Sequence, residues 1–423
     1  MTETLDSNPP APAPRRPLLT RPLLLRFVSI LGASTSFYLL LSVVPGYATA
    51  GGGGGGSAGL ATGSLMLATV VGELATPSLV DRYGYRAVLA AGLGLLGAPA
   101  LALALSQNLW WIAAVCLLRG LGFAFTVVAG GALTASLIPA ERRGEGLALV
   151  GIVSGVPSLV ALPLGVWLAG YAGHTMVFTV GAVVALAAIL SVPGLPDRIR
   201  SSGRAVGIVE GLRAADLRRP AMVFAVTAVA AGIVVTFLPL AVPASDTGLV
   251  ALALFVQPAT ATLARWLAGR LGDRHGPAGL VLPGLLLSAA GTLLMVVTSS
   301  PIAVIAGVGV FGIGFGAAQN ATLTLMYARV PTAGYGTVSA LWNFAYDAGM
   351  GAGAVAFGWL AAGTGYPWAF ALTGTAMLTA VIPAWRDRLP AARSQAPERT
   401  PLPAGTDSAA RADPAPARPG DHT

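Results

Sequence analysis

The chain alternates between long apolar stretches and short polar segments rich in arginine, glycine and proline. Each apolar stretch is close to the roughly 20 helical residues that cross the ~30 Å hydrocarbon core of a bilayer. We therefore predict membrane-spanning helices over twelve stretches, at residues 27–44, 60–80, 87–105, 110–138, 146–169, 176–192, 221–242, 250–271, 279–297, 302–327, 338–362 and 368–384.

Two of the polar segments are copies of each other. Glu73–Gly84 and Arg265–Gly276 both end an apolar stretch with Asp-Arg-x-Gly, at an offset of 192 residues (265 less 73). The same offset, without a gap, aligns Arg119–Phe123 (RGLGF) with Phe311–Phe315 (FGIGF). It also aligns the proline at position 139 with that at 331, and the glycine at 144 with that at 336. This agreement predicts a duplicated six-helix half.

These segments resemble the signature loop between the second and third helices of each half in the major facilitator superfamily. The second copy carries the motif residues Gly269, Leu271, Asp273, Arg274 and Gly276. The first copy has Pro77 in place of the glycine and otherwise carries Leu79, Asp81, Arg82, Gly84 and Arg86. The Arg-Gly-x-Gly at 119–122 resembles the fourth-helix motif of the same family. Over residues 22 to 388 the resemblance implies an all-α membrane protein of twelve helices in two pseudo-symmetric six-helix bundles.

The resemblance also implies that the repeated turns act as gating loops. Their charged residues would pair with neighbouring charges and helix ends in one arrangement of the halves and release them in the other. The alternative is that Asp-Arg-x-Gly only ends the helix. We favour gating for both loops, with the residues Asp81, Arg82, Gly84, Asp273, Arg274 and Gly276.

Composition and charge fix the class of protein. The residues are 55 % hydrophobic and 10 % charged, which leaves too little polar surface to cover a soluble globule. All 25 basic residues are arginine, and only Arg119, Arg265 and Arg270, the last of these one residue from the end of its span, lie within predicted spans. The other arginines fall in the termini, the central linker and alternate connections, which predicts that both termini are cytoplasmic in a bacterial cell membrane. The excess of positive charge therefore reports topology, and we expect no nucleic-acid partner.

The pattern divides the chain into five parts. Two Pro- and Ala-rich ends, 1–21 and 389–423, are predicted to be disordered and cytoplasmic. Residues 22–194 and 220–388 are the two halves, and 195–219 is a cytoplasmic linker. The glycine run at 51–56 lacks the lysine and preceding strand of a phosphate-binding loop, so we expect a flexible extracytoplasmic turn.

Ionisable residues inside predicted spans are the candidates for proton coupling, because each costs on the order of 2.5 to 3.5 kcal/mol at a helix centre. A buried carboxyl group such as Glu73 is suited to taking up and releasing a proton. We favour coupling for Glu73 over a purely structural pairing with Arg119, although both readings are compatible. Asp347 is the second acid, and the resemblance places its helix beside the second helix, so that both carboxylates would lie near one conduit as a proton site or a cation site. The alternative for Asp347 is a structural hydrogen bond to a neighbouring helix. The family resemblance implies proton transfer for Arg119, and the alternative is a salt bridge between helices.

Several further side chains in the spans could line a polar substrate pocket. Arg265 belongs to this group unless it extends towards the membrane surface, about 12 Å along the helix. The uncharged members could equally form hydrogen bonds between helices. The candidates are Tyr38, Gln257, Arg265, Gln319, Asn320 and Asn343.

These features together favour a secondary transporter that exports a small, fairly hydrophobic organic compound by proton antiport. The fifth stretch, with Gly151, Gly155, Pro157, Pro163 and Gly165, is similar to the Gly- and Pro-rich motif of drug:proton antiporters, although it has no Gly-Pro dipeptide. The alternatives are proton-coupled uptake of a sugar or organic acid, and a membrane sensor or channel that transports nothing. One cysteine, three histidines and no nucleotide loop argue against an enzyme, and we expect no cofactor or metal. Partners are the substrate, protons and lipid, and the protein is expected to act as a monomer.

Overall fold

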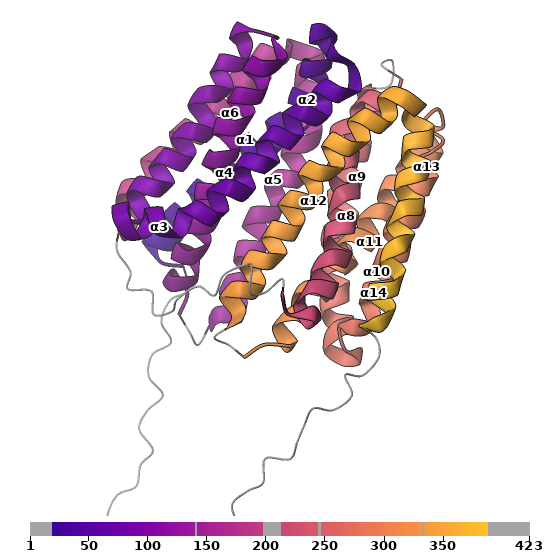
Figure 1. The fold of residues 1–423 in the computed structure, drawn as a ribbon. Helices are drawn as coiled ribbons and strands as arrows, with labels where there is room; N and C mark the ends of the chain where they lie inside the picture. Colours follow the sequence, from indigo (N-terminus) through magenta and orange to yellow (C-terminus); the bar gives the residue numbers. More distant parts are fainter. Residues whose placement is uncertain (1–18, 140–141, 198–212, 244–246, 332–333, 388–423) are drawn as a thin grey trace, which may run out of the picture. The chain divides into compact units, whose positions relative to one another are not determined.

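A computed structural model describes residues 19–139, 142–197, 213–243, 247–331 and 334–387 (Figure 1). Within these ranges every regular element is a helix. The expected disordered ends at 1–21 and 389–423, apart from residues 19–21, lie outside the described residues, as do residues 198–212 of the expected linker.

The long helices follow one another with short connections. The first half contains α1 (Arg21–Leu41), α2 (Val44–Ala48), α3 (Gly54–Ala102), α4 (Leu109–Leu137), α5 (Arg143–Ala172) and α6 (His174–Ala188). The second contains α8 (Ala215–Ala241), α9 (Thr247–His275), α10 (Ala278–Leu294), α11 (Pro301–Ala328), α12 (Tyr335–Thr364), α13 (Tyr366–Met377) and α14 (Val381–Arg386). Short turns of other helix types are Thr49–Gly53, Leu103–Leu105, Ile189–Gly194 and Leu378–Ala380.

These helices account for the twelve expected spans. Eight segments are long and apolar enough to cross a membrane, and the first of them, Arg21–Leu105, contains three spans in succession. They are separated by the turn Thr49–Gly53 and by Gly84, where α3 leaves helical geometry with φ +84° and ψ 167°. Dividing this segment into three and adding α10 and α12 gives twelve spans within the described residues.

Two sequence expectations are wrong in detail at the beginning of the chain. The first helix starts at Arg21, six residues before the predicted start at position 27, so Arg26 lies inside a helix and is 4 % exposed. Arg26 is therefore a further arginine inside a membrane-spanning helix, in addition to Arg119, Arg265 and Arg270. The glycine run is not wholly a turn, because α3 begins at Gly54 and only Gly52 and Gly54 have positive φ.

The repeat inferred from sequence extends to backbone geometry. The turn glycines Gly84 and Gly276 share a φ of 84°. The same offset of 192 residues relates Gly173 to Gly365, with φ of 82° and 78°, and each N–H donates to the carbonyl oxygen four residues earlier. Only glycine adopts such a φ routinely. The two copies therefore turn the chain at equivalent places, as expected for pseudo-symmetric halves.

Among the described residues, two helix pairs make the most extensive contacts between the halves: α3 packs on α12, and α5 packs on α9. Along the first pair the backbones approach closely, because a Cβ at Gly59 would collide with the carbonyl oxygen of Ala354. Nearby, the hydroxyl groups of Thr62 on α3 and Thr236 on α8 are hydrogen-bonded at 3.0 Å. The small residues on α3 thus let the two halves touch directly.

The two ends of the bundle differ in charge. We call the end of the bundle at which α1 begins and α14 ends the arginine-rich side (Figure 1). The arginines at this end lie at helix ends: Arg142 precedes α5, Arg274 lies in the last turn of α9, and Arg329 follows α11. The opposite, arginine-free side holds α2 and the starts of α3 and α13. The contacts of Gly59 and Thr62 lie in the first turns of α3, so they join the halves towards the arginine-free side.

An ion pair ties helix ends together on the arginine-rich side of the second half. The Arg329 guanidinium lies 3.1 Å from the Asp387 carboxyl group and also donates to the backbone carbonyl of Asp216 at 2.6 Å. Burial raises the pKa of Asp387 above its ordinary value, and Arg329 opposes that shift. These contacts fix the ends of α8, α11 and α14 relative to each other.

Candidate functional site

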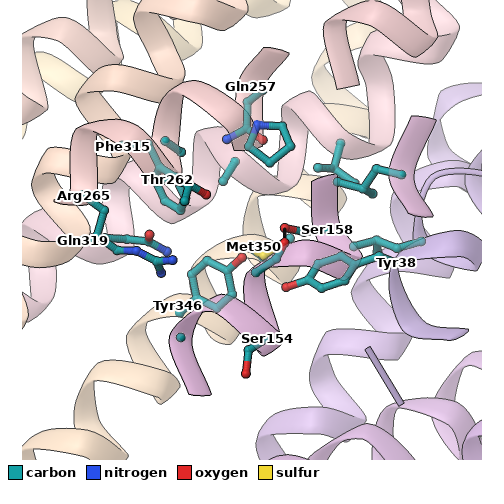
Figure 2. A pocket seen from close by; sticks show the side chains of 18 residues that line it. Tyr38, Ser154, Ser158, Gln257, Thr262, Arg265, Phe315, Gln319, Tyr346 and Met350 are labelled. Carbon is teal, nitrogen blue, oxygen red and sulfur yellow. Dashed lines mark hydrogen bonds between the residues drawn. The ribbon is translucent and has the colours of Figure 1, made fainter. Parts of the chain in front are cut away.

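A cavity of about 220 Å³ lies between the two halves. Its walls come from α1 and α5 of the first half and from α8, α9, α11 and α12 of the second. Figure 2 shows the hydroxyl groups of Tyr38, Ser158 and Tyr346 pointing towards the same part of the cavity. Such a site, mostly apolar with a few convergent polar groups, is typical of small-molecule binding.

Two of the helices that line the cavity contain proline close to it. Pro157 and Pro163 lie inside α5, and Pro258 lies inside α9. Proline removes one helical hydrogen bond and disturbs the turn before it. In α5, Ser154 and Ser158 are four residues apart, which places both hydroxyl groups on the face that lines the cavity.

The two candidate acids meet across the interface between the halves. Glu73 belongs to α3 and Asp347 to α12, and their carboxyl groups form a side-chain hydrogen bond. Asp347 is 5 % exposed and Glu73 is half-buried. An ionised carboxylate only accepts hydrogen bonds, so this contact requires a proton on one of the two groups. One proton shared by the two carboxyl groups would therefore satisfy this contact between the halves.

Two tyrosines connect this acid pair to the cavity. The side chains of Tyr38 and Tyr346 interact electrostatically with both Asp347 and Arg265. Arg265 lines the cavity, and among the described lining residues it is the one with a charged side chain. It forms no hydrogen bond or ion pair within the part of the chain that the structure describes. The cavity thus offers one guanidinium and two phenol groups, with the acids behind them.

Arg119 lies away from the acid pair, inside the first half. Its guanidinium is 1 % exposed and donates to the carbonyl oxygens of Leu96 on α3, at 3.1 Å, and Ser36 on α1, at 3.0 Å. Glu73 is hydrogen-bonded to Asp347, and no contact between Glu73 and Arg119 is found among the described residues. In this arrangement Arg119 holds α1 and α3 against α4, and its role in proton coupling stays a prediction.

A second buried arginine, Arg26, was not singled out from the sequence. Its guanidinium donates to the carbonyl oxygens of Thr126 and Gly130, both at 3.1 Å, and to the hydroxyl groups of Ser29 and Thr134. The signal was present in the sequence, because Arg26 lies one residue before the predicted first span. The residue clamps α1 to α4.

The two gating loops lie on the arginine-rich side with their charges exposed. Asp81, Arg82, Asp273 and Arg274 are all exposed to solvent, and within the described ranges neither aspartate forms a hydrogen bond or an ion pair. Arg82 lies over the ring of Tyr83 at 5.2 Å. The glycines Gly84 and Gly276 supply the two turns. The loops are thus in an unpaired arrangement here, and their gating role stays a prediction.

The structure places four of the six pocket candidates on the cavity: Tyr38, Gln257, Arg265 and Gln319. The other two, Asn320 and Asn343, are not among the lining residues. Asn320 follows Gln319 by one position, so it points about 100° away around α11 and lies near Gly269. Lining residues that sequence reasoning did not single out include Ser154, Ser158, Thr262, Phe315 and Met350.

The described residues contain no group of three or more His, Cys, Asp or Glu side chains that could hold a metal ion. The one cysteine, Cys116, is buried in α4.

The comparison with family models decides the family. The model of the Major Facilitator Superfamily matches residues 26–256 and 220–418. The chain belongs to the Major Facilitator Superfamily. It is accordingly a multi-pass membrane transporter of small molecules and not an enzyme.

Relatives within the superfamily are distant. The chain is 24 % identical over 347 residues to a multi-drug resistance efflux pump PmrA homolog of Lactococcus lactis subsp. lactis (strain IL1403), covering 78 % of this chain and 85 % of the relative. Solved structures with the same fold include the nucleoside transporter NupG, at TM-score 0.68 and 15 % identity over 87 % of this chain and 99 % of NupG. A bacterial homolog of the human lysosomal transporter Spinster, in an inward-facing and unoccupied conformation, has TM-score 0.65 and 14 % identity over 87 % of this chain and 94 % of its own.

Proposed function

We propose that this transporter exports a small, fairly hydrophobic organic compound in exchange for protons, by alternating access. The cavity between the halves supports this, because its lining combines aromatic and aliphatic side chains with hydroxyl and amide groups. The Lactococcus relative, named as an efflux pump, supports export as the direction.

The observation that carries the proposal is the hydrogen bond between Glu73 and Asp347. One carboxyl group belongs to each half, so the charge of the pair acts directly on the contact between α3 and α12. With one proton the pair is held together. Without a proton two like charges lie side by side in a poorly polar setting and repel each other. Loss and gain of a proton would thus bias the two arrangements of the halves.

The gating loops fit the same cycle. The halves touch towards the arginine-free side through Gly59 and Thr62, while Asp81 and Asp273 on the other side have no ion pair within the described residues. In the opposite arrangement we expect these aspartates to find partners. Arg119 would support the cycle by holding the first half rigid.

For localisation we propose a bacterial cell membrane with the arginine-rich side and both termini in the cytoplasm. The positive-inside rule states that cytoplasmic loops carry an excess of Lys and Arg. The connections on the arginine-rich side have this excess, and the connections on the other side contain no arginine. With this orientation the structure would be closed to the outside. We also propose that a single chain transports without a partner subunit.

The test is transport by proteoliposomes that contain the full chain. The first step is a growth-inhibition panel in a drug-sensitive host, with and without the gene, to find a compound whose accumulation falls. For that compound, Glu73→Gln and Asp347→Asn should each abolish proton-driven transport, because an amide cannot exchange a proton. Asp216→Asn is the matched control: it also removes one carboxylate, but from an exposed position at the start of α8. Transport in both interface variants that still responds to a pH gradient would refute the proton site.

A second candidate function is uptake of an organic acid together with a proton. The observation that favours it is Arg265, a half-buried guanidinium on the cavity without a described ion pair. A carboxylate bound there would be repelled by an ionised Glu73–Asp347 pair and tolerated by a protonated one, so acid and proton would bind together. A pH gradient decides between the two: it drives the compound in the direction of proton flow for uptake and against it for export. Arg265→Gln should weaken binding far more for uptake of an acid.

A further inference from the structure

A second hollow lies beside the central cavity, on the outer surface of the same helix pair. It measures about 410 Å³ and is formed by α5 and α9. We call it the seam groove, and its lining residues are Leu159, Val160, Pro163, Leu164, Trp167, Ala251 and Phe255. The side chains of Val160, Trp167 and Phe255 are about half exposed, at 53 %, 55 % and 47 %. In a membrane protein such exposed apolar side chains face the hydrocarbon of the bilayer.

The wall between the seam groove and the central cavity is one helix pair thick. Adjacent residues of α5 line different hollows. Ser158 and Leu162 line the cavity, whereas the next residues, Leu159 and Pro163, line the groove. In the most apolar stretch of α5 only 22 % of the residues are buried, against 78 % in α8. The helix therefore has lipid on one face and the cavity on the other.

Proline weakens this wall from both helices. Pro157 and Pro163 interrupt α5 and Pro258 interrupts α9, all within a few residues of the groove or the cavity. Each removes a backbone N–H donor and permits the helix to bend. The other contact between the halves is built differently, because Gly59 on α3 lies directly against the backbone of α12 at Ala354.

We propose that the transported compound passes between the bilayer and the central cavity through the seam of α5 and α9. Its chemical class is an amphiphile that dissolves in the membrane, with an apolar body and one polar end. The seam groove, whose one polar lining group is the Trp167 indole N–H, accepts the apolar body. The polar end meets Ser158 and Gln257, which face the cavity on either side of the seam. The inference rests on the proposed transport function, and it explains how a fairly hydrophobic compound reaches a buried site.

The experiment measures access to the cavity by thiol labelling and needs neither a substrate nor a proton gradient. Replacing the one native cysteine gives the background Cys116→Ala, and Ser158→Cys places a reporter on the cavity wall. Proteoliposomes of the full chain are treated with N-pyrenylmaleimide, which dissolves in the bilayer, or with the charged, water-soluble reagent MTSET. The seam groove is then filled by Leu164→Trp. Ile152→Trp, at a 63 % exposed position of α5 outside the groove, is the matched control.

Filling the groove should slow pyrene labelling at least fivefold and leave labelling by MTSET unchanged, while Ile152→Trp should change neither rate. Equal slowing of both reagents would mean that Leu164→Trp distorts the cavity, and an unchanged pyrene rate would mean that the seam is not a route. Either result overturns the proposal. Val160→Trp repeats the test at a second groove position if Leu164→Trp fails to fold. Because labelling is independent of proton coupling, its outcome is separate from that of the acid variants above.

Discussion

The two buried arginines of this transporter form hydrogen bonds to neighbouring helices, mostly to backbone carbonyl oxygens, and no ion pair is described for either. Arg26 and Arg119 are both almost fully buried, and the partners described for them are carbonyl oxygens and hydroxyl groups of neighbouring helices. A buried guanidinium that donates to acceptors on several helices holds those helices together. Moving one helix away would leave a charged donor without an acceptor, which costs free energy. The free-energy cost of burying each guanidinium is thus offset inside one half, and neither arginine depends on the contact between the halves.

The clamp formed by Arg26 gives a prediction at this scale. Gly130 lies under the guanidinium, and a Cβ there would collide with it. Gly130→Ala should therefore displace Arg26 from its acceptors and destabilise the protein by roughly 1–3 kcal/mol. The measurement is the apparent Tm of the purified protein in detergent, which should fall by several degrees. Gly131→Ala, at the next position and with open space around it, should leave the Tm unchanged. Equal Tm values for both variants would contradict the clamp.

At the scale of elements, the two repeated turns share the same glycine backbone conformation but have different neighbouring residues. Gly84 and Gly276 have the same φ. At Gly84 the backbone N–H of Tyr85 donates to the Asp197 carbonyl oxygen at 3.0 Å, and the N–H of Arg86 donates to the Asp197 carboxyl group at 3.2 Å. The first turn therefore holds the chain where it leaves the first half. Around Gly276 a Cβ would meet open space.

This difference predicts unequal effects of the same substitution. Alanine at either position should cost on the order of 1–3 kcal/mol, because side chains rarely adopt this φ. Gly84→Ala should cost more than Gly276→Ala, since its Cβ would also lie 2.6 Å from the Asp197 carboxyl group and push it away from Arg86. Thermal unfolding of the two variants side by side makes the comparison. A larger loss for Gly276→Ala would show that Asp197 is not a stabilising partner.

The sequence predicted the membrane-spanning helices better than it predicted the side-chain contacts between those helices. Apolar length and the 192-residue offset located the spans, because a bilayer requires a minimum apolar length of each helix and a duplicated half repeats the same order of helices. The meeting of Glu73 with Asp347 depends on how two halves pack, which spacing along the chain does not determine. The family resemblance predicted it, because it places the helix of Asp347 beside the second helix. Gln319 and Asn320 make the same point: both are polar and adjacent, but helix rotation puts only Gln319 on the cavity. Arg26 was misjudged because the helix begins before the apolar stretch does.

For the whole molecule, the two main contacts between the halves are packed differently, and we infer that they have different roles when the halves move. The α3–α12 contact brings backbones together at Gly59 and holds the acid pair deeper along the same helices. The α5–α9 contact is interrupted by proline and has a hollow on each face. A close backbone contact is easily lost to one added side chain, whereas a helix pair with a hollow on each face has room to move. Rocking of the halves should therefore be most sensitive to substitutions in the first contact.

This expectation is tested by enlarging one residue in the α3–α12 contact. Gly59→Val should prevent α3 from packing on Ala354 and shift the population towards the arrangement that is open on the arginine-free side. The reporter is Thr62→Cys in the Cys116→Ala background, because Thr62 is 2 % exposed and lies at the contact with α8. In detergent, the rate of labelling by MTSET should rise at least tenfold with Gly59→Val.

Gly56→Ala is the control for this variant, since it lies on the same helix and a Cβ there meets nothing within 4 Å. It should leave the rate of Thr62→Cys labelling unchanged. If Gly59→Val lowers the apparent Tm without faster labelling, the contact stabilises the fold and does not govern access. If labelling rises and Glu73→Gln reverses it, the acid pair and the glycine contact control the same equilibrium. An uncharged amide at position 73 removes the repulsion that the fully ionised pair would exert between α3 and α12, so it biases the halves towards the packed arrangement that Gly59→Val opposes.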